Sequence, residues 1–145
     1  MTGLLTLTLW LAQAQAQGGA APALPEDIQV DADVTYCRVG ERELKLDVVR
    51  TKPKPATPQP ALVYIHGGAF RAGNKMTGRA ALVPLVREGY VGFTLSYRLS
   101  GEALWPAQIQ DLKCAIRYIR ANAAQWGVDG ERIAAWGPSA GGHLS

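Results

Sequence analysis

The sequence is poor in the residues that bind metals and in charge of one sign. Its 145 residues include only two cysteines and two histidines, and none has the spacing typical of a metal site. We therefore expect neither a metal nor a cofactor. Fifteen basic and 12 acidic residues give a net charge of +3. These charges are scattered in ones and twos, which argues against a nucleic-acid partner.

The two cysteines are expected to be free thiols. Cys37 and Cys114 lie about eighty positions apart, the first on an expected edge strand and the second within an expected helix. This placement suits two buried free thiols better than a bridge. Export from the cytoplasm would permit a bridge but would not require one.

Long apolar runs are also missing, and the run over residues 4–12 is too short to span a bilayer. Small residues follow it at alternate positions, a pattern that resembles a secretory signal peptide over residues 1–16. Met1-Thr2-Gly3 carries no basic residue, so a disordered tail or a misplaced start codon stays open. We expect a secreted or periplasmic protein with a linker over residues 17–27.

Ser139 is the centre of the most informative segment, Gly137-Pro138-Ser139-Ala140-Gly141. The apolar run over residues 133–136 precedes it and predicts a buried strand, and a helix is expected from Ala140. A serine on so sharp a turn needs small neighbours, and this pattern is typical of a nucleophile. A plain glycine-rich turn is the alternative. A phosphate-binding loop is disfavoured, because no lysine follows Gly141 or Gly142.

A second motif, His66-Gly67-Gly68-Ala69, follows the apolar run over residues 61–65. Together the two motifs resemble the α/β-hydrolase esterase and lipase group, whose oxyanion loop reads His-Gly-Gly-Gly. Tyr97-Arg98-Leu99 resembles part of a segment of hormone-sensitive-lipase-like esterases. That family has Asp where Ser96 stands here. This difference, with Ala69 in the loop, points to the relatives of bacterial feruloyl and acetyl-xylan-type esterases.

The order of expected elements predicts an α/β fold with three layers. We expect a mostly parallel sheet with an antiparallel N-terminal edge, within a hydrolase domain over residues 28–145. The four prolines between residues 51 and 60 predict an extended surface connection. Residues 129–132 predict a turn, and Pro84 predicts a kink or a late start in its helix. The expected strands cover residues 34–37, 44–49, 61–65, 91–95 and 133–136, and the helices cover residues 77–88 and about 106–126.

The resemblance implies roles for the residues of both motifs. Ser139 would be the nucleophile, and the backbone N–H groups of Gly68, Ala69 and Ala140 would form the oxyanion hole. Supporting roles in the two motifs fall to His66, which would order its loop by hydrogen bonds, and to Gly67, Gly137 and Gly141. Phe70 and Trp105 could each line the acyl cleft or simply pack into the core.

The triad acid and histidine come after the serine in this fold, and only six residues follow Ser139. His143 lies one turn beyond the serine and is expected to be structural, as is Asp111. The triad acid and histidine are therefore expected to be absent. We interpret the chain as the N-terminal portion of an enzyme, cut after the nucleophile elbow, inactive and unstable by itself.

The expected activity is hydrolysis of small-molecule carboxylic esters through an acyl-enzyme, as in carboxylesterases or feruloyl esterases. Two alternatives stay open. One is a kynurenine-formamidase-like amide hydrolase, which the same groups would serve, and the other is a non-catalytic binding module with this fold. The sequence does not indicate an oligomeric state.

Overall fold

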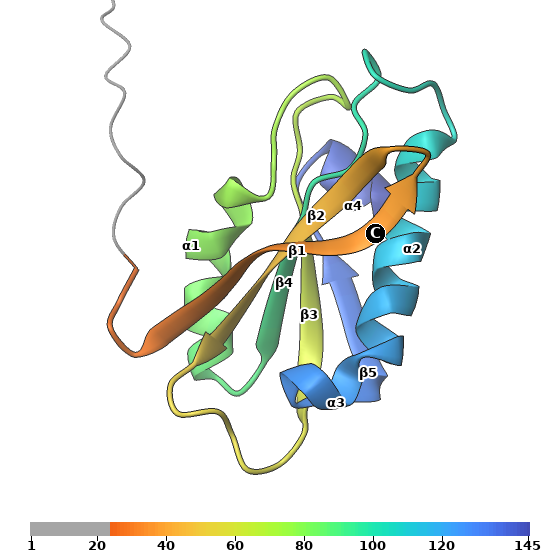
Figure 1. The fold of residues 1–145 in the computed structure, drawn as a ribbon. Helices are drawn as coiled ribbons and strands as arrows, with labels where there is room; N and C mark the ends of the chain where they lie inside the picture. The colour runs from red at the N-terminus through yellow and green to blue at the C-terminus, as the bar shows by residue number, and fades with distance from the viewer. Residues whose placement is uncertain (1–23) are drawn as a thin grey trace, which may run out of the picture.

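Five strands form one sheet in the computed structural model, which describes residues 24–145 (Figure 1). The order across the sheet is β1-β2-β4-β3-β5. β1 pairs with β2 and β2 with β4 in antiparallel fashion, whereas β3 pairs with β4 and β5 in parallel. The predicted antiparallel edge and parallel strands are thus confirmed. The strands are β1 (Ile28–Val39), β2 (Arg42–Thr51), β3 (Gln59–Ile65), β4 (Val91–Leu95) and β5 (Val128–Trp136).

Helices cover both faces of this sheet (Figure 1). Two apolar clusters, one on each face, follow from the alternation of side chains along the strands. Val63 and Ile65 pack towards Leu112 of α2, whereas Tyr64 between them packs towards Leu82 of α1. The predicted three-layer arrangement is confirmed. The helices are α1 (Met76–Arg87), α2 (Ala107–Ala121), α3 (Ala123–Trp126) and α4 (Ala140–Leu144).

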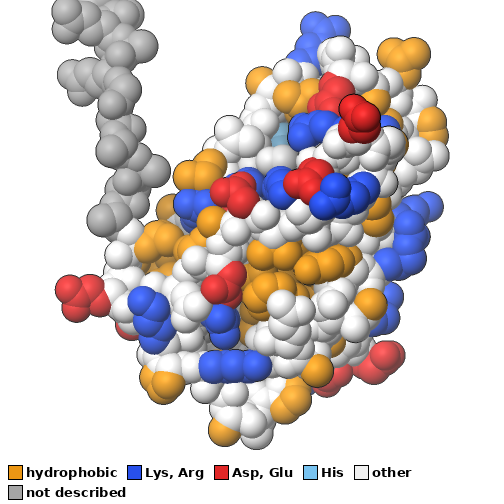
Figure 2. Space-filling view, in the orientation of Figure 1, with side chains coloured by type: hydrophobic (Ala, Val, Ile, Leu, Met, Phe, Trp, Pro, Cys, Tyr) orange, Lys and Arg blue, Asp and Glu red, His pale blue; other side chains and the backbone are white. Residues whose placement is uncertain are grey.

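The β1–β2 hairpin is longer than the predicted strands over residues 34–37 and 44–49. Its turn is made by Gly40, whose φ of 58° lies in the left-handed region that glycine adopts readily. Ion pairs lie along the surface of the hairpin, among them Arg50 with Asp31 and Lys45 with Glu43. Figure 2 shows both signs of charge mixed on this face. Pairs of this kind at the surface contribute little to stability.

The helices differ from their predicted form at two points. α1 starts at Met76 and contains Pro84, so the predicted late start is wrong. The second helix breaks at Asn122, where α2 ends and the short α3 follows. Gly127 then takes a left-handed φ of 71°, which ends α3 and lets β5 begin at once at Val128.

The predicted turn over residues 129–132 lies inside β5 rather than before it. Val128 pairs with Gln59, but the next pair along the two strands is Ile133 with Ala61. The residues between Val128 and Ile133 therefore bulge from the sheet. The prediction that residues 133–136 form a buried strand is wrong about burial. β5 is an edge strand among the described residues, and Trp136 is 38% exposed.

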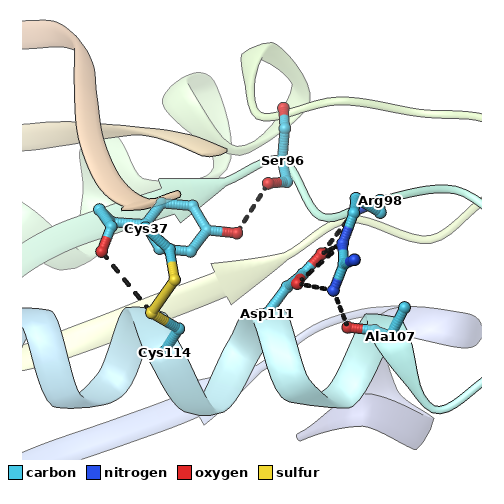
Figure 3. The surroundings of a disulfide bond; sticks show 7 residues. Cys37, Ser96, Arg98, Ala107, Asp111 and Cys114 are labelled. Atoms are coloured by element: carbon cyan, nitrogen blue, oxygen red, sulfur yellow. Dashed lines mark hydrogen bonds and ion pairs between the residues drawn. A yellow bond between two sulfur atoms is a disulfide. The ribbon is translucent and has the colours of Figure 1, made fainter. Parts of the chain in front are cut away.

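Cys37 and Cys114 form a disulfide, so the prediction of free thiols is wrong (Figure 3). The hairpin curves over the face of the sheet that α2 covers (Figure 1). Cys37, near the end of β1, is therefore brought to the middle of α2, with 6.2 Å between the two Cα atoms. A short local strand pattern does not reveal this curvature, so the sequence separation misled the prediction.

Candidate active site

Ser139 occupies a strained turn between β5 and α4, with φ of 50° and ψ of −121°. Few residues other than glycine adopt a positive φ, and such strain often marks a functional site. A Cβ atom at Gly137 or at Gly141 would lie 2.0 Å from the carbonyl oxygen of Ile65. Both positions therefore require glycine, because the turn is pressed against the end of β3.

The segment after β3 is a second strained turn. Gly68, Ala69 and Phe70 have φ values of 114°, 52° and 62°. The carbonyl of Gly68 accepts hydrogen bonds from the N–H groups of Arg71 and Ala72, at 2.9 and 3.0 Å. Three consecutive residues in this region of φ turn the backbone sharply at the carboxyl end of the strand.

The two turns lie side by side. β3 and β5 are parallel neighbours, so their carboxyl ends share one edge of the sheet. A Cβ atom at Gly67 would lie 3.0 Å from the carbonyl oxygen of Pro138 and 3.6 Å from the Cβ atom of Ser139. The structure therefore places the His-Gly-Gly loop against the serine, with Ala140 next to Ser139 at the start of α4.

His66 is held within its own loop. Its side chain is buried, and its Nδ1 atom lies 2.8 Å from the carbonyl oxygen of Gly67. A carbonyl only accepts, so Nδ1 carries the proton. The ring stacks on Tyr97 at 4.3 Å, and the Tyr97 hydroxyl donates to the His66 carbonyl at 3.0 Å. Burial lowers the pKa of His66, against the smaller opposing effect of the Gly67 carbonyl.

Tyr97 supports the His-Gly-Gly loop, a role that the residue patterns did not reveal. The sequence marked it only as part of a family-like segment, yet its side chain is buried and its ring stacks on His66. Burial raises the pKa of the Tyr97 phenol, so the hydroxyl remains a donor at neutral pH.

Aromatic side chains surround the other histidine. His143 is exposed on α4, and its ring meets that of Phe70 edge-on at 5.8 Å and that of Trp105 at 6.1 Å. Phe70 is partly buried against the core. Trp105 is 61% exposed, so the alternative in which it packs into the core is wrong. Within residues 24–145, no hydrogen bond joins a histidine ring to the Ser139 hydroxyl.

Asp111 binds Arg98 and fixes the segment that follows β4 (Figure 3). Its carboxylate is 1% exposed and accepts from the Arg98 guanidinium at 2.6 and 2.9 Å. It also accepts from the Arg98 backbone N–H at 2.9 Å. Bidentate pairs of this kind are geometrically specific. The carboxylate is fully used in this contact, as expected for a structural acid.

One groove of about 380 Å³ lies between α2 and the edge strand β5, and its lining residues include Val63, Ile109, Leu112, Ile116, Ala135 and Leu144. Ser139 is not among the lining residues, so this groove is separate from the turn that carries Ser139.

Over the described part of the chain, no cluster of three metal-ligating side chains is present. None of the helices found there combines the length and hydrophobicity that crossing a membrane needs.

Comparison with known proteins adds independent evidence. The BD-FAE family model matches residues 46–145, which include both strained turns. The chain is 43% identical to Esterase LipC of Mycobacterium tuberculosis over 101 residues, which are 69% of this chain and 25% of LipC. It is 36% identical over 121 residues to the probable carboxylic ester hydrolase LipM of the same organism, covering 82% of this chain and 28% of LipM.

Solved structures give the same picture. A truncated form of a carbohydrate esterase from gut microbiota superposes with a TM-score of 0.75 and 39% identity, covering 87% of this chain and 45% of that one. A bacterial heroin esterase gives 0.74 and 33%, covering 82% and 38%. The chain spans about a quarter of the length of these curated relatives and less than half of these solved chains.

Proposed function

Because the chain belongs to the BD-FAE family, we propose that it carries the nucleophile and the oxyanion hole of a carboxylic ester hydrolase. The predicted α/β-hydrolase fold is shared with the solved esterases. The observation that carries the proposal is the contact between the two strained turns. The Gly67 Cα lies so close to Ser139 that a methyl group there would meet the serine Cβ at 3.6 Å.

Ser139 attacks the ester carbonyl in this proposal and forms an acyl-enzyme, which water then hydrolyses. The developing oxyanion is stabilised by backbone N–H groups of Ala140, Gly68 and Ala69. Removing one such donor typically costs about a hundred- to a thousand-fold in rate. The positive φ values at Gly68 and Ala69 fix the direction of these N–H groups before the substrate arrives.

The serine hydroxyl needs a general base, because its own pKa makes it a weak nucleophile at neutral pH. His66 is engaged with Gly67 and Tyr97, and its position within the loop suits it to hold the oxyanion hole in shape. In this fold the acid and the base follow the serine in the chain. The substrates we infer are small-molecule esters.

The decisive experiment compares the wild-type full-length gene product with Ser139→Ala. Hydrolysis of short p-nitrophenyl esters and labelling by a fluorophosphonate probe should both be lost in the variant. Ser145→Ala is the matched control, since Ser145 lies on the same segment and only donates to the Gly141 carbonyl. Ester hydrolysis that survives Ser139→Ala would disprove the assignment. Cleavage of amides but not of esters would favour an amide hydrolase.

We also propose that the protein is exported to an oxidising compartment. The Cys37–Cys114 disulfide supports this, because such bonds persist outside the cytoplasm. The predicted signal peptide over residues 1–16 lies outside the described residues. N-terminal sequencing of protein recovered from the periplasm or medium should begin near Gln17, and recovery from the cytoplasm with Met1 in place would contradict export.

A further inference from the structure

A partly buried ion cluster lies next to the His-Gly-Gly loop, and the residue patterns gave no sign of it. We call it the Lys75 cluster, and it consists of Lys75, Asp33, Asp47 and Arg79. The Lys75 ammonium lies 2.8 Å from both Asp33 and Asp47. Asp47 is completely buried and also accepts from Arg79 at 2.7 Å and from the Asp33 backbone N–H at 2.9 Å.

The backbone of Lys75 is fixed as firmly as its side chain. Its N–H donates to the Ser96 hydroxyl at 3.0 Å, and its carbonyl accepts from the Thr94 hydroxyl at 2.8 Å. One turn further, a Cβ atom at Gly78 would lie 2.2 Å from the Thr94 hydroxyl oxygen. The first turn of α1 therefore sits directly on β4, and Lys75 has no freedom to shift along the sheet.

Lys75 lies two residues after Gly73, the loop residue that packs against His66 and Gly67. A Cβ atom at Gly73 would lie 2.4 Å from His66 Nδ1 and 2.8 Å from the Gly67 carbonyl oxygen. A displacement of Lys75 would therefore be passed through Gly73 to His66 and Gly67. The loop between them stores strain, because Ala69 and Phe70 hold positive φ values that residues other than glycine rarely adopt. Such strain persists only where both ends are held.

A bulge in β1 places Asp33, one of the two counterions of Lys75. The pairing of β1 with β2 shifts register between Asp31 and Val34, and Asp33 within this bulge has a φ of 58°. This conformation directs its N–H to Asp47 and its carboxylate to Lys75. Bulges are typically used to re-aim a side chain. A buried ion pair contributes little net stability compared with apolar packing, so geometry is the better reason for this arrangement.

We propose that Lys75 is a positioning residue for the loop that carries Gly68 and Ala69, with Asp33 and Asp47 as its counterions. The assignment of that loop as an oxyanion hole rests on the proposed function. The mechanical claim, that the Lys75 cluster holds residues 66–74 in their strained conformation, stands on the contacts alone.

The first arm of the test measures hydrogen–deuterium exchange in the full-length gene product. Lys75→Met should speed exchange of amides in residues 66–74 by about tenfold, while β3 and β4 exchange as before. Asp33→Asn keeps a residue that tolerates the left-handed conformation but removes the charge, so a smaller acceleration is expected. Asp31→Asn is the matched control, because it makes the same chemical change in β1 but affects contacts with Arg50 and Gln29, which lie outside the Lys75 cluster.

The second arm measures ester hydrolysis. Lys75→Met should lower kcat by about tenfold and leave KM within about threefold, because a misplaced oxyanion hole weakens the transition state more than substrate binding. A lower melting temperature with unchanged loop exchange and unchanged kcat would overturn the proposal. Should Lys75→Met fail to fold, Asp33→Asn decides, and exchange no faster than in Asp31→Asn would overturn it. A wild-type protein without esterase activity would refute the proposed function, while the exchange comparison still tests Lys75.

Discussion

Cys37 at the end of β1 is bonded to Cys114 in the middle of α2, so the outermost strand is fastened to the helix that covers the sheet. The bond closes a loop of 77 residues in sequence. Replacing both cysteines by serine should lower the free energy of unfolding by about 4 kcal/mol, since the unfolded chain regains the entropy of that loop. Urea denaturation of the two proteins measures the difference.

Reduction provides the control for this prediction. A reducing agent should destabilise the wild-type protein by a similar amount and leave the double serine variant unchanged. Equal stability of oxidised and reduced wild-type protein would show that the bond does not hold the hairpin.

Gly137→Ala should disrupt the active-site turn. The added Cβ atom would lie 2.0 Å from the Ile65 carbonyl oxygen, which belongs to the backbone and cannot rotate away. We expect a loss of stability of about 3 kcal/mol and loss of fluorophosphonate labelling at Ser139. Gly101→Ala is the matched control, because its Cβ atom meets nothing within 4 Å. Normal labelling of the Gly137 variant would show that the turn tolerates displacement.

The sheet could be predicted because its signals are local. β4 occupies the predicted residues 91–95, and the two motifs lie at the ends of β3 and β5 as the alternation of strands and helices requires. Periodicity reports whether a residue faces the core, and the turn residues report where a strand ends. The strained φ value at Ser139 agrees with the sharp turn that its motif indicated.

The remaining features depend on contacts between distant segments. Neither the Cys37–Cys114 bond nor the burial of Asp47 follows from a local pattern, because the bond depends on how the hairpin curves and the burial depends on partners far away in the sequence. Asp47 alternates with apolar neighbours and so resembles an exposed position, yet Lys75 and Arg79 of a distant segment make its burial possible. The exposure of β5 likewise depends on which strands pair with it, and not on its own composition.

The Arg98–Asp111 pair should be costly to break from one side. Asp111→Ala leaves the Arg98 guanidinium and its backbone N–H without their acceptor in a buried place, and should cost about 3–5 kcal/mol. Replacing both residues, as in Arg98→Met with Asp111→Leu, should cost less than the sum of the two single changes. A double-mutant cycle measured by denaturant unfolding tests this coupling, and additive effects would contradict it.

The stability of the protein should depend on the protonation of His66. Burial lowers the pKa of this imidazole below its usual value of 6.5, so the unfolded chain binds a proton at a higher pH than the folded protein does. The contribution of neutral His66 is therefore complete above about pH 6.5 and is lost as the pH falls towards the folded-state pKa. Denaturation between about pH 5 and 8 should show the free energy of unfolding falling on the acid side. His66→Gln should weaken this dependence, whereas His143→Gln, which removes the exposed histidine, should retain it. An equal acid-side loss in the wild-type protein and in His66→Gln would place the responsible group elsewhere.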